Sequence, residues 1–277
     1  MMAGFRARYF WQALRLTATV LLVAFLVAPM IIVVIISFSS AQFLTFPPPG
    51  FSMQWYRNLY ADPAWVDSLT TSLEIVIPTG TLAMAIGTAA ALGLSRSRIP
   101  GKNIIIGVLM SPIVVPVIII AAAIFGAYRI WNLNGTLTGF ILAHTVLTVP
   151  YVVSTVLASL QMVHEQYENA ALTLGASPWV VFRHIVLPLI LPGVLSGLLF
   201  AMVISFDELV VSLFISSPTF RPVTVQMWSD VLGDINPTIA AIGTLLFLFS
   251  LLVLLAEALM RRTGIELGRH GLLGEAS

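Results

Sequence analysis

Cysteine is absent from this chain of 277 residues, and charged residues are scarce, at 9% of the composition. The lack of cysteine excludes disulfide bonds, thiolate metal sites and a cysteine nucleophile. The few charges form no basic patch, so no nucleic-acid partner is expected. Hydrophobic residues instead make up 58% of the chain, and apolar runs long enough to cross a bilayer recur along it. These features indicate an all-α integral membrane protein surrounded by a lipid bilayer.

Familiar catalytic signatures are also missing. The chain contains neither the phosphate-binding pattern G-x-x-x-x-G-K-[ST] nor the zinc-binding pattern H-E-x-x-H. Gly193 and Gly197 flank a serine that is misplaced for a G-x-S-x-G nucleophile elbow, and these small residues suit close helix packing instead. We therefore expect no catalytic residues, no metal site and no cofactor in this chain. Any chemical energy that the protein uses must come from another chain.

Six apolar segments are each near the ~20 residues needed to cross a hydrocarbon core. They cover approximately residues 17–38, 69–94, 104–126, 137–160, 189–216 and 239–260. This layout predicts an N-terminal segment at 1–16, a six-helix transmembrane domain at 17–260 and a C-terminal tail at 261–277. Prolines at 112, 116 and 150 interrupt the third and fourth segments and are expected to kink them.

The 13 basic residues are distributed unequally between the two sides of this predicted domain. One side carries Arg6, Arg8, Arg15, Arg96, Arg98, Lys102, Arg183, Arg261, Arg262 and Arg269, whereas the other keeps Arg57, Arg129 and Arg221. Cytoplasmic loops of membrane proteins carry an excess of Lys and Arg. Both termini and the loop between the fourth and fifth segments are therefore predicted to be cytoplasmic.

That cytoplasmic loop, residues 161–188, contains the most informative pattern in the chain. Glu168, Ala170, Ala171 and Gly175 begin the arrangement E-x-A-A-x(3)-G-x(9)-I-x-L-P. Good helix formers precede the glycine, which predicts a short helix that ends there, because glycine commonly follows a helix end. The small side chains would let another protein approach the backbone closely.

A second short helix is predicted directly after this turn. Ser177 suits the N-cap of that helix, and Pro178 suits its first position. The loop is therefore predicted to form a helix-turn-helix in which Glu168 pairs with a cation. The alternative is a solvated loop that only connects two spans.

Carboxylates inside the fifth segment form the second informative feature. Asp207 and Glu208 lie about nine residues, or ~13 Å, from the outer end of that segment if it is one helix. Adjacent helical positions differ by ~100°, so only one of the two is expected to face a transport pathway. No Lys or Arg lies within a helical turn, so a cationic substrate would supply the missing charge. The alternative is that these are protonated or hydrogen-bonded structural groups.

Two further residues complete the predicted pathway, and three aromatic residues are candidates for docking on the outer side. Phe206 precedes the two carboxylates, and Glu74 lies near the outer end of the second segment, where a structural role is an equal alternative. Trp55 and Tyr56 belong to a short amphipathic stretch that suits either the membrane interface or an external partner. Trp228 lies in the outer loop at 217–237, within a predicted short helix that extends to Asp230 and Asp234.

The 161–188 pattern matches every position of the EAA loop of permease subunits from bacterial ABC importers, and the whole layout resembles that family. The acidic stretch at 206–211 and the pattern Phe51-x-x-x-Trp55-Tyr56 are similar to the spermidine/putrescine type. The resemblance implies a type I importer fold in the inner membrane of a bacterium. It also implies a second homologous permease, two copies of a cytoplasmic ATPase that binds ATP and Mg, and an external solute-binding protein. Residues from Glu168 to Gly175 would be the coupling helix, seated in a groove of the ATPase.

Three alternatives remain open at this point. The first is an ABC permease for a different, amino-acid-like solute. The second is a proton-coupled secondary carrier in which Asp207, Glu208 and Glu74 form a relay, although six spans without an internal repeat fit poorly with the inverted-repeat carriers. The third is a membrane-embedded enzyme, for which the chain offers no nucleophile, base or metal set.

Overall fold

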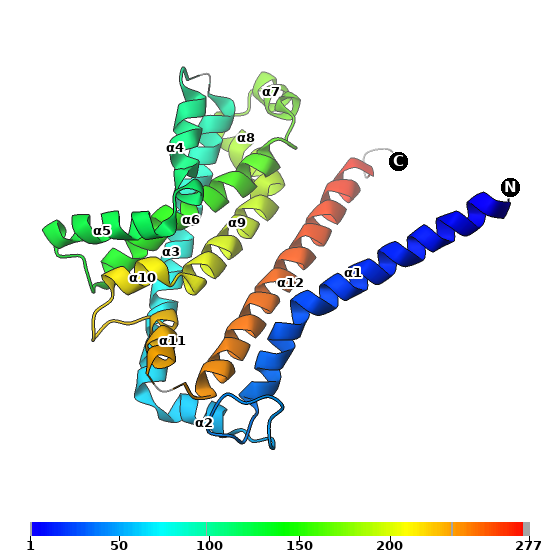
Figure 1. The fold of residues 1–277 in the computed structure, drawn as a ribbon. Helices are drawn as coiled ribbons and strands as arrows, with labels where there is room; N and C mark the ends of the chain where they lie inside the picture. Colours follow the sequence, from blue (N-terminus) through cyan, green and yellow to red (C-terminus); the bar gives the residue numbers. More distant parts are fainter. Residues whose placement is uncertain (1, 98, 234, 274–277) are drawn as a thin grey trace. The chain divides into compact units, whose positions relative to one another are not determined.

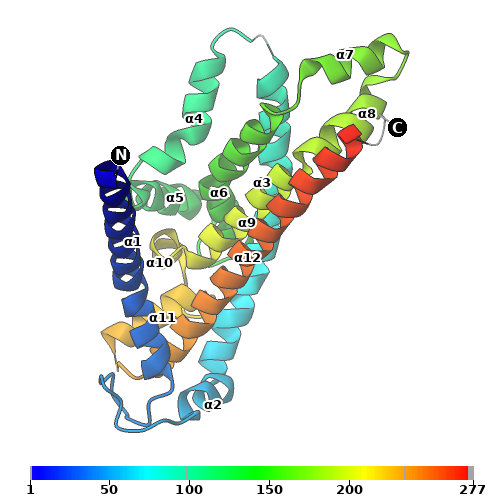
Figure 2. The ribbon, with the colours of Figure 1, turned by 90° about the vertical axis from the view of Figure 1, so that its right-hand side faces the viewer.

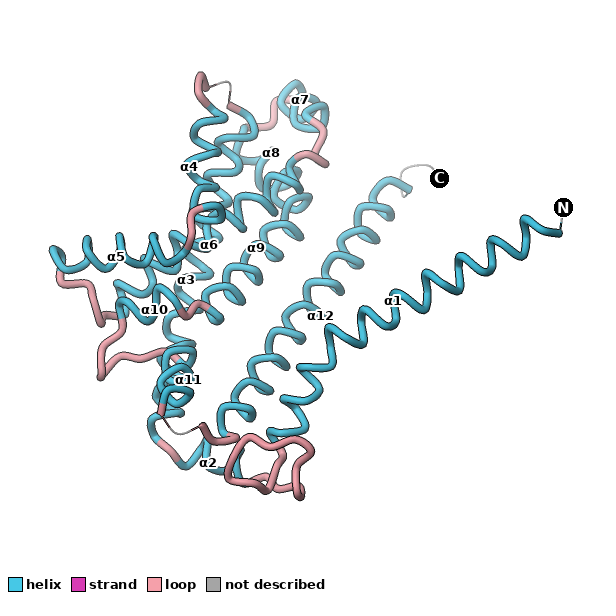
Figure 3. The backbone as a smooth tube through the Cα atoms, viewed as in Figure 1, coloured by secondary structure: helices cyan, strands magenta, loops and turns pink. Residues whose placement is uncertain are grey.

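The computed structural model describes residues 2–97, 99–233 and 235–273. This described part is largely helical and contains no β-strand, only the isolated bridges Ser39–Phe51 and Ser217–Phe220 (Figure 3). The chain divides into two compact units. The first comprises Met1–Pro63 and Ser229–Leu248, and the second comprises Ala64–Trp228 and Phe249–Ser277.

The helices are labelled in chain order in Figure 1. They are α1 (Met2–Ser37), α2 (Gln54–Ala61), α3 (Pro63–Arg96), α4 (Lys102–Val114), α5 (Val117–Trp131), α6 (Leu137–Leu160), α7 (Glu165–Thr173), α8 (Pro178–Val181), α9 (Leu187–Asp207), α10 (Val210–Ile215), α11 (Val223–Leu232) and α12 (Thr238–Leu273). A π-helical turn at Phe182–Val186 joins α8 to α9. Helices α1 and α12 run through the predicted segment boundaries at residues 16 and 260, so no helix end marks either boundary.

Five helices in the described part are long and apolar enough to cross a membrane, and a bent pair raises that number to six if it is one span. The five segments are Leu14–Ser37, Pro63–Arg96, Leu137–Leu160, Pro178–Asp207 and Thr238–Leu255. The prediction of six helical spans is thus confirmed in number only if the pair α4 and α5 is one broken span. The third segment, predicted at 104–126 with kinks at its prolines, is broken into two helices: α4 and α5 meet at an angle of 101°.

Proline explains the break between α4 and α5. Val115 directly precedes Pro116 and is extended, with φ −71° and ψ 131°. A proline ring disfavours helical backbone in the residue before it, and proline has no N–H to continue the hydrogen-bond ladder. The fifth predicted span, 189–216, is also wrong as a single helix. Its helix α9 ends at Asp207, and Glu208 is extended, with φ −72° and ψ 108°.

The first unit is held together by hydrogen bonds around the C-terminal end of α1. The Tyr56 hydroxyl lies 2.8 Å from the Ser37 hydroxyl, and the Trp55 indole N–H donates to the carbonyl of Ser39 at 2.8 Å. The Asn58 side-chain amide donates to the Thr238 hydroxyl at 3.1 Å, which ties α2 to the start of α12. Helix α2 is therefore fixed to both neighbouring segments of its own unit.

The second unit is built around α3, α6 and α9, which share an apolar core. The buried members of this core are Ala83 and Ala91 on α3, Val149, Val152, Val153, Val156 and Leu160 on α6, and Ile190, Val194 and Ala201 on α9, with Val163, Val181 and Val186 from the intervening loop. A second buried cluster joins α5 and α10 to α3 and α6 through residues such as Tyr128, Phe140 and Ile215. Figures 1 and 2 show α7 and α8 at the same end of this unit as the C-terminal end of α3.

Glycine permits the close approach of α6 and α9, as the sequence predicted. A Cβ atom on Gly193 would lie 2.0 Å from the Ser159 hydroxyl oxygen and 2.9 Å from the carbonyl oxygen of Thr155. A Cβ on Gly197 would lie 3.1 Å from the Cα atom of Val152. Because these neighbours include backbone atoms, the two helices could not keep this separation with larger residues on α9.

We expect Gly193→Ala to destabilise the protein by about 1–3 kcal/mol, the usual cost of overpacking a tight site. Gly107→Ala in α4 is the matched control, because no atom of the described residues lies within 4 Å of its added Cβ. Both substitutions favour helix intrinsically, so helix propensity alone predicts equal effects. Thermal unfolding of the purified protein in detergent measures the difference. Equal stability of the two variants would contradict the proposed close packing.

Candidate functional site

The loop between α6 and α9 forms the helix-turn-helix that the sequence predicted. Helix α7 ends at Thr173, and the Gly175 and Ala176 amides donate to the carbonyls of Leu172 and Ala171, at 3.0 and 3.1 Å. Gly175 has φ +88°, a left-handed conformation that glycine adopts without the strain other residues incur. The predicted helix end is confirmed, and the turn depends on this glycine.

The second helix of the loop begins as predicted and then changes from an α-helix to a π-helical turn. The Ser177 hydroxyl accepts a hydrogen bond from the Val180 N–H at 3.4 Å, and Pro178 occupies the first turn of α8. The π-helical turn at Phe182–Val186 was not predicted. Pro188 lies two residues after the end of this turn and has no N–H to offer the carbonyl of His184, which favours a departure from regular α-helical bonding at this place.

Arg96, the last residue of α3, is the cation that pairs with Glu168. Its guanidinium group contacts the carboxylate of Glu168, lies 3.3 Å from that of Glu165, and donates to the carbonyl of Val163 at 3.4 Å. The sequence indicated only that Arg96 is cytoplasmic and that Glu168 needs a partner. The structure thus adds an anchor that attaches α7 to the end of α3.

The outward side of this loop is apolar and open. The exposed fraction is 89% for Leu174 and 64% for Trp179, and Ala170 is also exposed. No atom of the described residues lies within 4 Å of the Cβ position of Gly175. We name Ala170, Leu174, Gly175 and Trp179 the coupling face. Beneath the loop, a cavity of about 240 Å³ lies between α3, α7 and α8, with Arg96 and Glu168 in its lining.

The two carboxylates after Phe206 have different environments. Glu208 is not helical, so the predicted ~100° separation of the two side chains on one helix does not apply. The Glu208 carboxylate accepts a hydrogen bond from the Val211 N–H at 2.9 Å, near the start of α10. Asp207 is the last residue of α9, its side chain is exposed, and no ion pair or hydrogen bond to it occurs in the described part. Of the two carboxylates, only that of Glu208 forms a hydrogen bond within the described residues.

The other predicted pathway residues are separated. The Phe206 ring packs against Phe249 of α12, with ring centroids 5.1 Å apart. Glu74 is exposed on α3, on the same helical face as Thr70, Ile77 and Thr81. Thr70 and Thr81 are exposed on this face as well. An exposed polar face on a membrane-spanning helix needs water or another protein to cover it.

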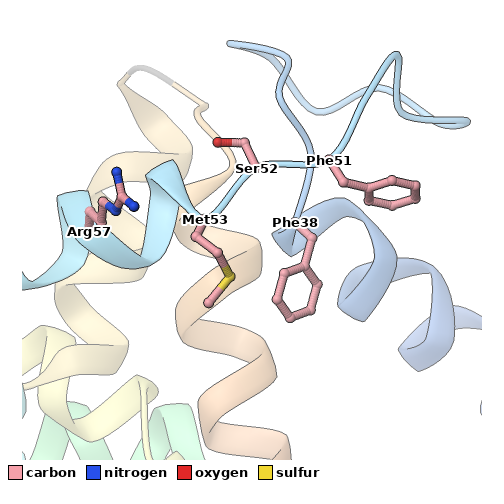
Figure 4. A pocket seen from close by; sticks show the side chains of 5 residues that line it. All are labelled: Phe38, Phe51, Ser52, Met53 and Arg57. Atoms are coloured by element: carbon pink, nitrogen blue, oxygen red, sulfur yellow. The ribbon is translucent and has the colours of Figure 1, made fainter.

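Two of the three residues predicted to dock a partner on the outer side already form hydrogen bonds within this chain. Trp55 and Tyr56 form the hydrogen bonds of the first unit described above. Trp228 lies on α11 with an exposed fraction of 42%, and that helix includes Asp230, whereas Asp234 lies outside the described residues. A cavity of about 520 Å³ lies beside α2, lined by Phe38, Phe51, Ser52, Met53 and Arg57 (Figure 4).

Comparison with known proteins decides the family. Residues 83–265 match the family described as the binding-protein-dependent transport system inner membrane component, and this range contains the whole helix-turn-helix loop. The chain belongs to this family. It is a multi-pass permease subunit of an ABC importer, so the predicted transport function, the membrane location and the non-catalytic role are confirmed at this level. The secondary carrier and the membrane enzyme are not supported.

Two curated relatives and one solved structure illustrate the similarity. The chain is 32% identical to the spermidine/putrescine transport system permease protein PotC of Haemophilus influenzae, over 86% of this chain and 93% of the relative. It is 34% identical to the putrescine transport system permease protein PotI of Escherichia coli, over 80% and 81% of the two chains. A bacterial alginate ABC transporter, solved in complex with an alginate pentasaccharide-bound periplasmic protein, superposes with a TM-score of 0.68, covering 96% of this chain and 98% of that chain at 13% identity. This likeness confirms the fold of an ABC importer permease.

We expect Arg96→Gln to loosen α7, because the substitution removes the charge that holds Glu165 and Glu168. Hydrogen–deuterium exchange of the α7 amides should rise by about fivefold or more, because local opening becomes easier. Lys102→Gln is the control: Lys102 is a nearby basic residue that donates to the Ser95 carbonyl, and no hydrogen bond or ion pair joins it to α7 in the described part. An equal rise in both variants, or none in either, would show that Arg96 does not anchor the loop.

Proposed function

We propose that this permease carries a small cationic solute, such as spermidine or putrescine, into the cytoplasm. The names of the two curated relatives support this solute class. The observation that carries the proposal is the Asp207 carboxylate, which is exposed at the end of a membrane-spanning helix. The described residues supply no Lys or Arg partner for it, so an ammonium group would complete the charge balance.

The proposed complex contains a second, distinct permease homologous to this one. An ionisable residue in a spanning helix is stable when it faces a bundle interior or a water-filled cavity. Glu74 and its neighbouring threonines are exposed in this single chain. A second permease and an aqueous pathway between the two subunits would cover this face of α3.

We further propose that two copies of a cytoplasmic ATPase bind ATP and Mg, and that one copy receives the coupling face of this chain. An external solute-binding protein delivers the solute on the other side, where Trp228 remains a candidate contact. Exposed Leu174 and Trp179 give the coupling face apolar anchors, and Gly175 permits close approach of the ATPase surface. Closure of the ATPase dimer would displace α7, and rigid-body tilting of the spanning helices would open the pathway alternately to each side.

Asp207 in this mechanism is a transient contact for the solute. A site on a transport pathway must attract its solute and still release it, so a single carboxylate suits it better than a cage of ligands. Glu208 already accepts a backbone hydrogen bond, so its oxygen is less available than that of Asp207. Of these two adjacent carboxylates, Asp207 is therefore the one proposed to meet the solute.

Gly175→Asp should abolish the stimulation of ATPase activity by the loaded binding protein. The change strains a backbone with φ +88° and adds a carboxylate to the coupling face. Gly101→Asp is the matched control, because Gly101 also has a positive φ, +80°, and lies in the loop before α4, where the nearest side-chain atom to an added Cβ is Cδ1 of Ile104, at 4.0 Å. ATPase activity of the complex co-expressed from the neighbouring genes is measured with and without solute-loaded binding protein.

Each outcome of this measurement bears on a different part of the proposal. Stimulation by spermidine or putrescine that only Gly175→Asp removes would support both the coupled importer and the solute. Stimulation by an amino-acid-like solute alone would preserve the importer and refute the polyamine assignment. Equal loss in the Gly101→Asp control would refute the specific role of the coupling face.

Asp207→Asn should lower uptake of radiolabelled spermidine by the reconstituted importer by about tenfold, because one charge–charge attraction is lost. Glu208→Gln should have a much smaller effect, since the amide oxygen still accepts the hydrogen bond from the Val211 N–H. Both substitutions are nearly isosteric, so packing does not explain a difference. A larger loss in Glu208→Gln would reverse the proposed roles, and unchanged uptake in both variants would remove the anionic contact.

A further inference from the structure

His144, a buried residue of α6, forms hydrogen bonds with both of its ring nitrogens. Nδ1 lies 2.9 Å from the Ser205 hydroxyl oxygen on α9, and Nε2 lies 3.1 Å from the Ser212 hydroxyl oxygen on α10. All three side chains are buried, with exposed fractions of 1%, 3% and 0%. We name His144, Ser205 and Ser212 the His144 clasp.

The clasp bridges the break between α9 and α10, the two helices of the predicted fifth span. Ser205 lies in the last turn of α9, Ser212 lies in α10, and the extended residue Glu208 separates the two helices. Residues seven positions apart in a continuous helix would be separated by about 10 Å along its axis. One imidazole ring reaches both hydroxyls here, so the clasp fixes the ends of two helices relative to each other and to α6.

Both hydrogen bonds of the clasp can form with either tautomer of the histidine. A neutral imidazole has one N–H donor and one acceptor nitrogen, and each serine hydroxyl can donate or accept. Loss of either bond would leave buried polar groups unpaired in a region without water, which is costly. The clasp therefore favours one geometry of the break.

Asp207 lies inside the segment that the clasp holds, two residues after Ser205. The following residue, Glu208, is held by two further hydrogen bonds. Its carboxylate accepts from the Val211 N–H, and its backbone carbonyl accepts from the Thr224 hydroxyl at 3.2 Å. Hydrogen bonds of the residues on both sides thus constrain the backbone at Asp207.

We propose that His144 is a positioning residue for solute transfer, because its clasp on Ser205 and Ser212 holds the break between α9 and α10 in the form that presents Asp207 to the solute. This inference rests on the proposed function, in which Asp207 contacts a cationic solute. His144 itself is buried and does not touch the solute. A residue that serves packing alone could be replaced by an apolar side chain of similar size, whereas the clasp requires a donor and an acceptor.

The test uses the complete importer reconstituted in liposomes, with uptake of radiolabelled spermidine measured over a range of concentrations. His144→Leu removes both bonds and should reduce uptake at low spermidine by about tenfold. His144→Gln keeps one donor and one acceptor and should retain most of the uptake. Ser154→Ala is the control, because this exposed hydroxyl of α6 bonds to the Pro150 carbonyl of its own helix and to the Met110 sulfur of α4, and has no bond to α9 or α10 in the described part.

The double variant His144→Leu with Asp207→Asn separates positioning from packing. If the clasp acts through Asp207, the double variant should transport no worse than Asp207→Asn alone. Losses that multiply would overturn the inference and leave the role of Asp207 intact. Full uptake by His144→Leu would also overturn it.

The experiment distinguishes an error in the proposed function from an error in the role given to the clasp. Unchanged uptake by Asp207→Asn alone would refute the anionic contact and, with it, the positioning role. If His144→Leu does not assemble, Ser212→Ala replaces it in the same cycle, because it removes one hydroxyl from the clasp and leaves the ring in place. Effects of Ser212→Ala and Asp207→Asn that multiply would then overturn the inference.

Discussion

The close approach of α6 and α9 is the constraint on which both ends of the site depend. Apolar side chains in lipid gain little by meeting one another, so spanning helices associate through tight packing and hydrogen bonds. Gly193 and Gly197 bring the backbone of α9 against α6 near Val152 and Thr155. The helix-turn-helix loop at 161–188, called the coupling loop below, connects one end of this helix pair, and the His144 clasp joins the pair near the other end. Both places therefore depend on how these two helices pack.

The coupling loop is attached to the rest of the second unit in two ways. Arg96 joins α7 to the end of α3 through charged hydrogen bonds, which are stronger than neutral ones. The other attachment passes through α8 and the π-helical turn at Phe182–Val186, a winding that departs from the regular α-helical ladder. A force applied at the coupling face would reach α3 directly and α9 through this wider turn. The second unit thus joins α7 directly to α3 and, through α8 and the π-helical turn, to α9.

Local chemistry predicted the coupling loop well, because its turn depends on residues that are close in sequence. Gly175, Ser177 and Pro178 each have a conformational preference that acts within a few residues, and the structure follows those preferences. The partner of Glu168 could not be predicted, since Arg96 is 72 residues away and pairing over that distance depends on the packing of helices. The six apolar segments were identified for a similar reason: hydropathy summed over about 20 residues is a strong local signal.

Hydropathy summed over about 20 residues does not reveal a break within a span. Pro116 offered a visible reason to bend the third span, but its size, 101°, depends on how α4 and α5 pack. Most residues around Asp207 and Glu208 are apolar, so hydropathy summed over the segment gives no sign that α9 ends. The break is stabilised by groups from elsewhere in the chain, including the hydroxyl of Thr224 and the ring of His144. Only the folded chain brings these groups together.

The break also explains how two adjacent carboxylates can be tolerated within a membrane-spanning segment. A continuous helix would leave both without backbone donors, because its N–H groups are already paired. Ending α9 at Asp207 frees the first amides of α10, and the Glu208 carboxylate accepts one of them. Asp207 retains the only charge of the pair that is free to meet a solute. Under the proposed function, a polyamine would contact this carboxylate through one ammonium group, and a single contact of this kind would let the solute be released again.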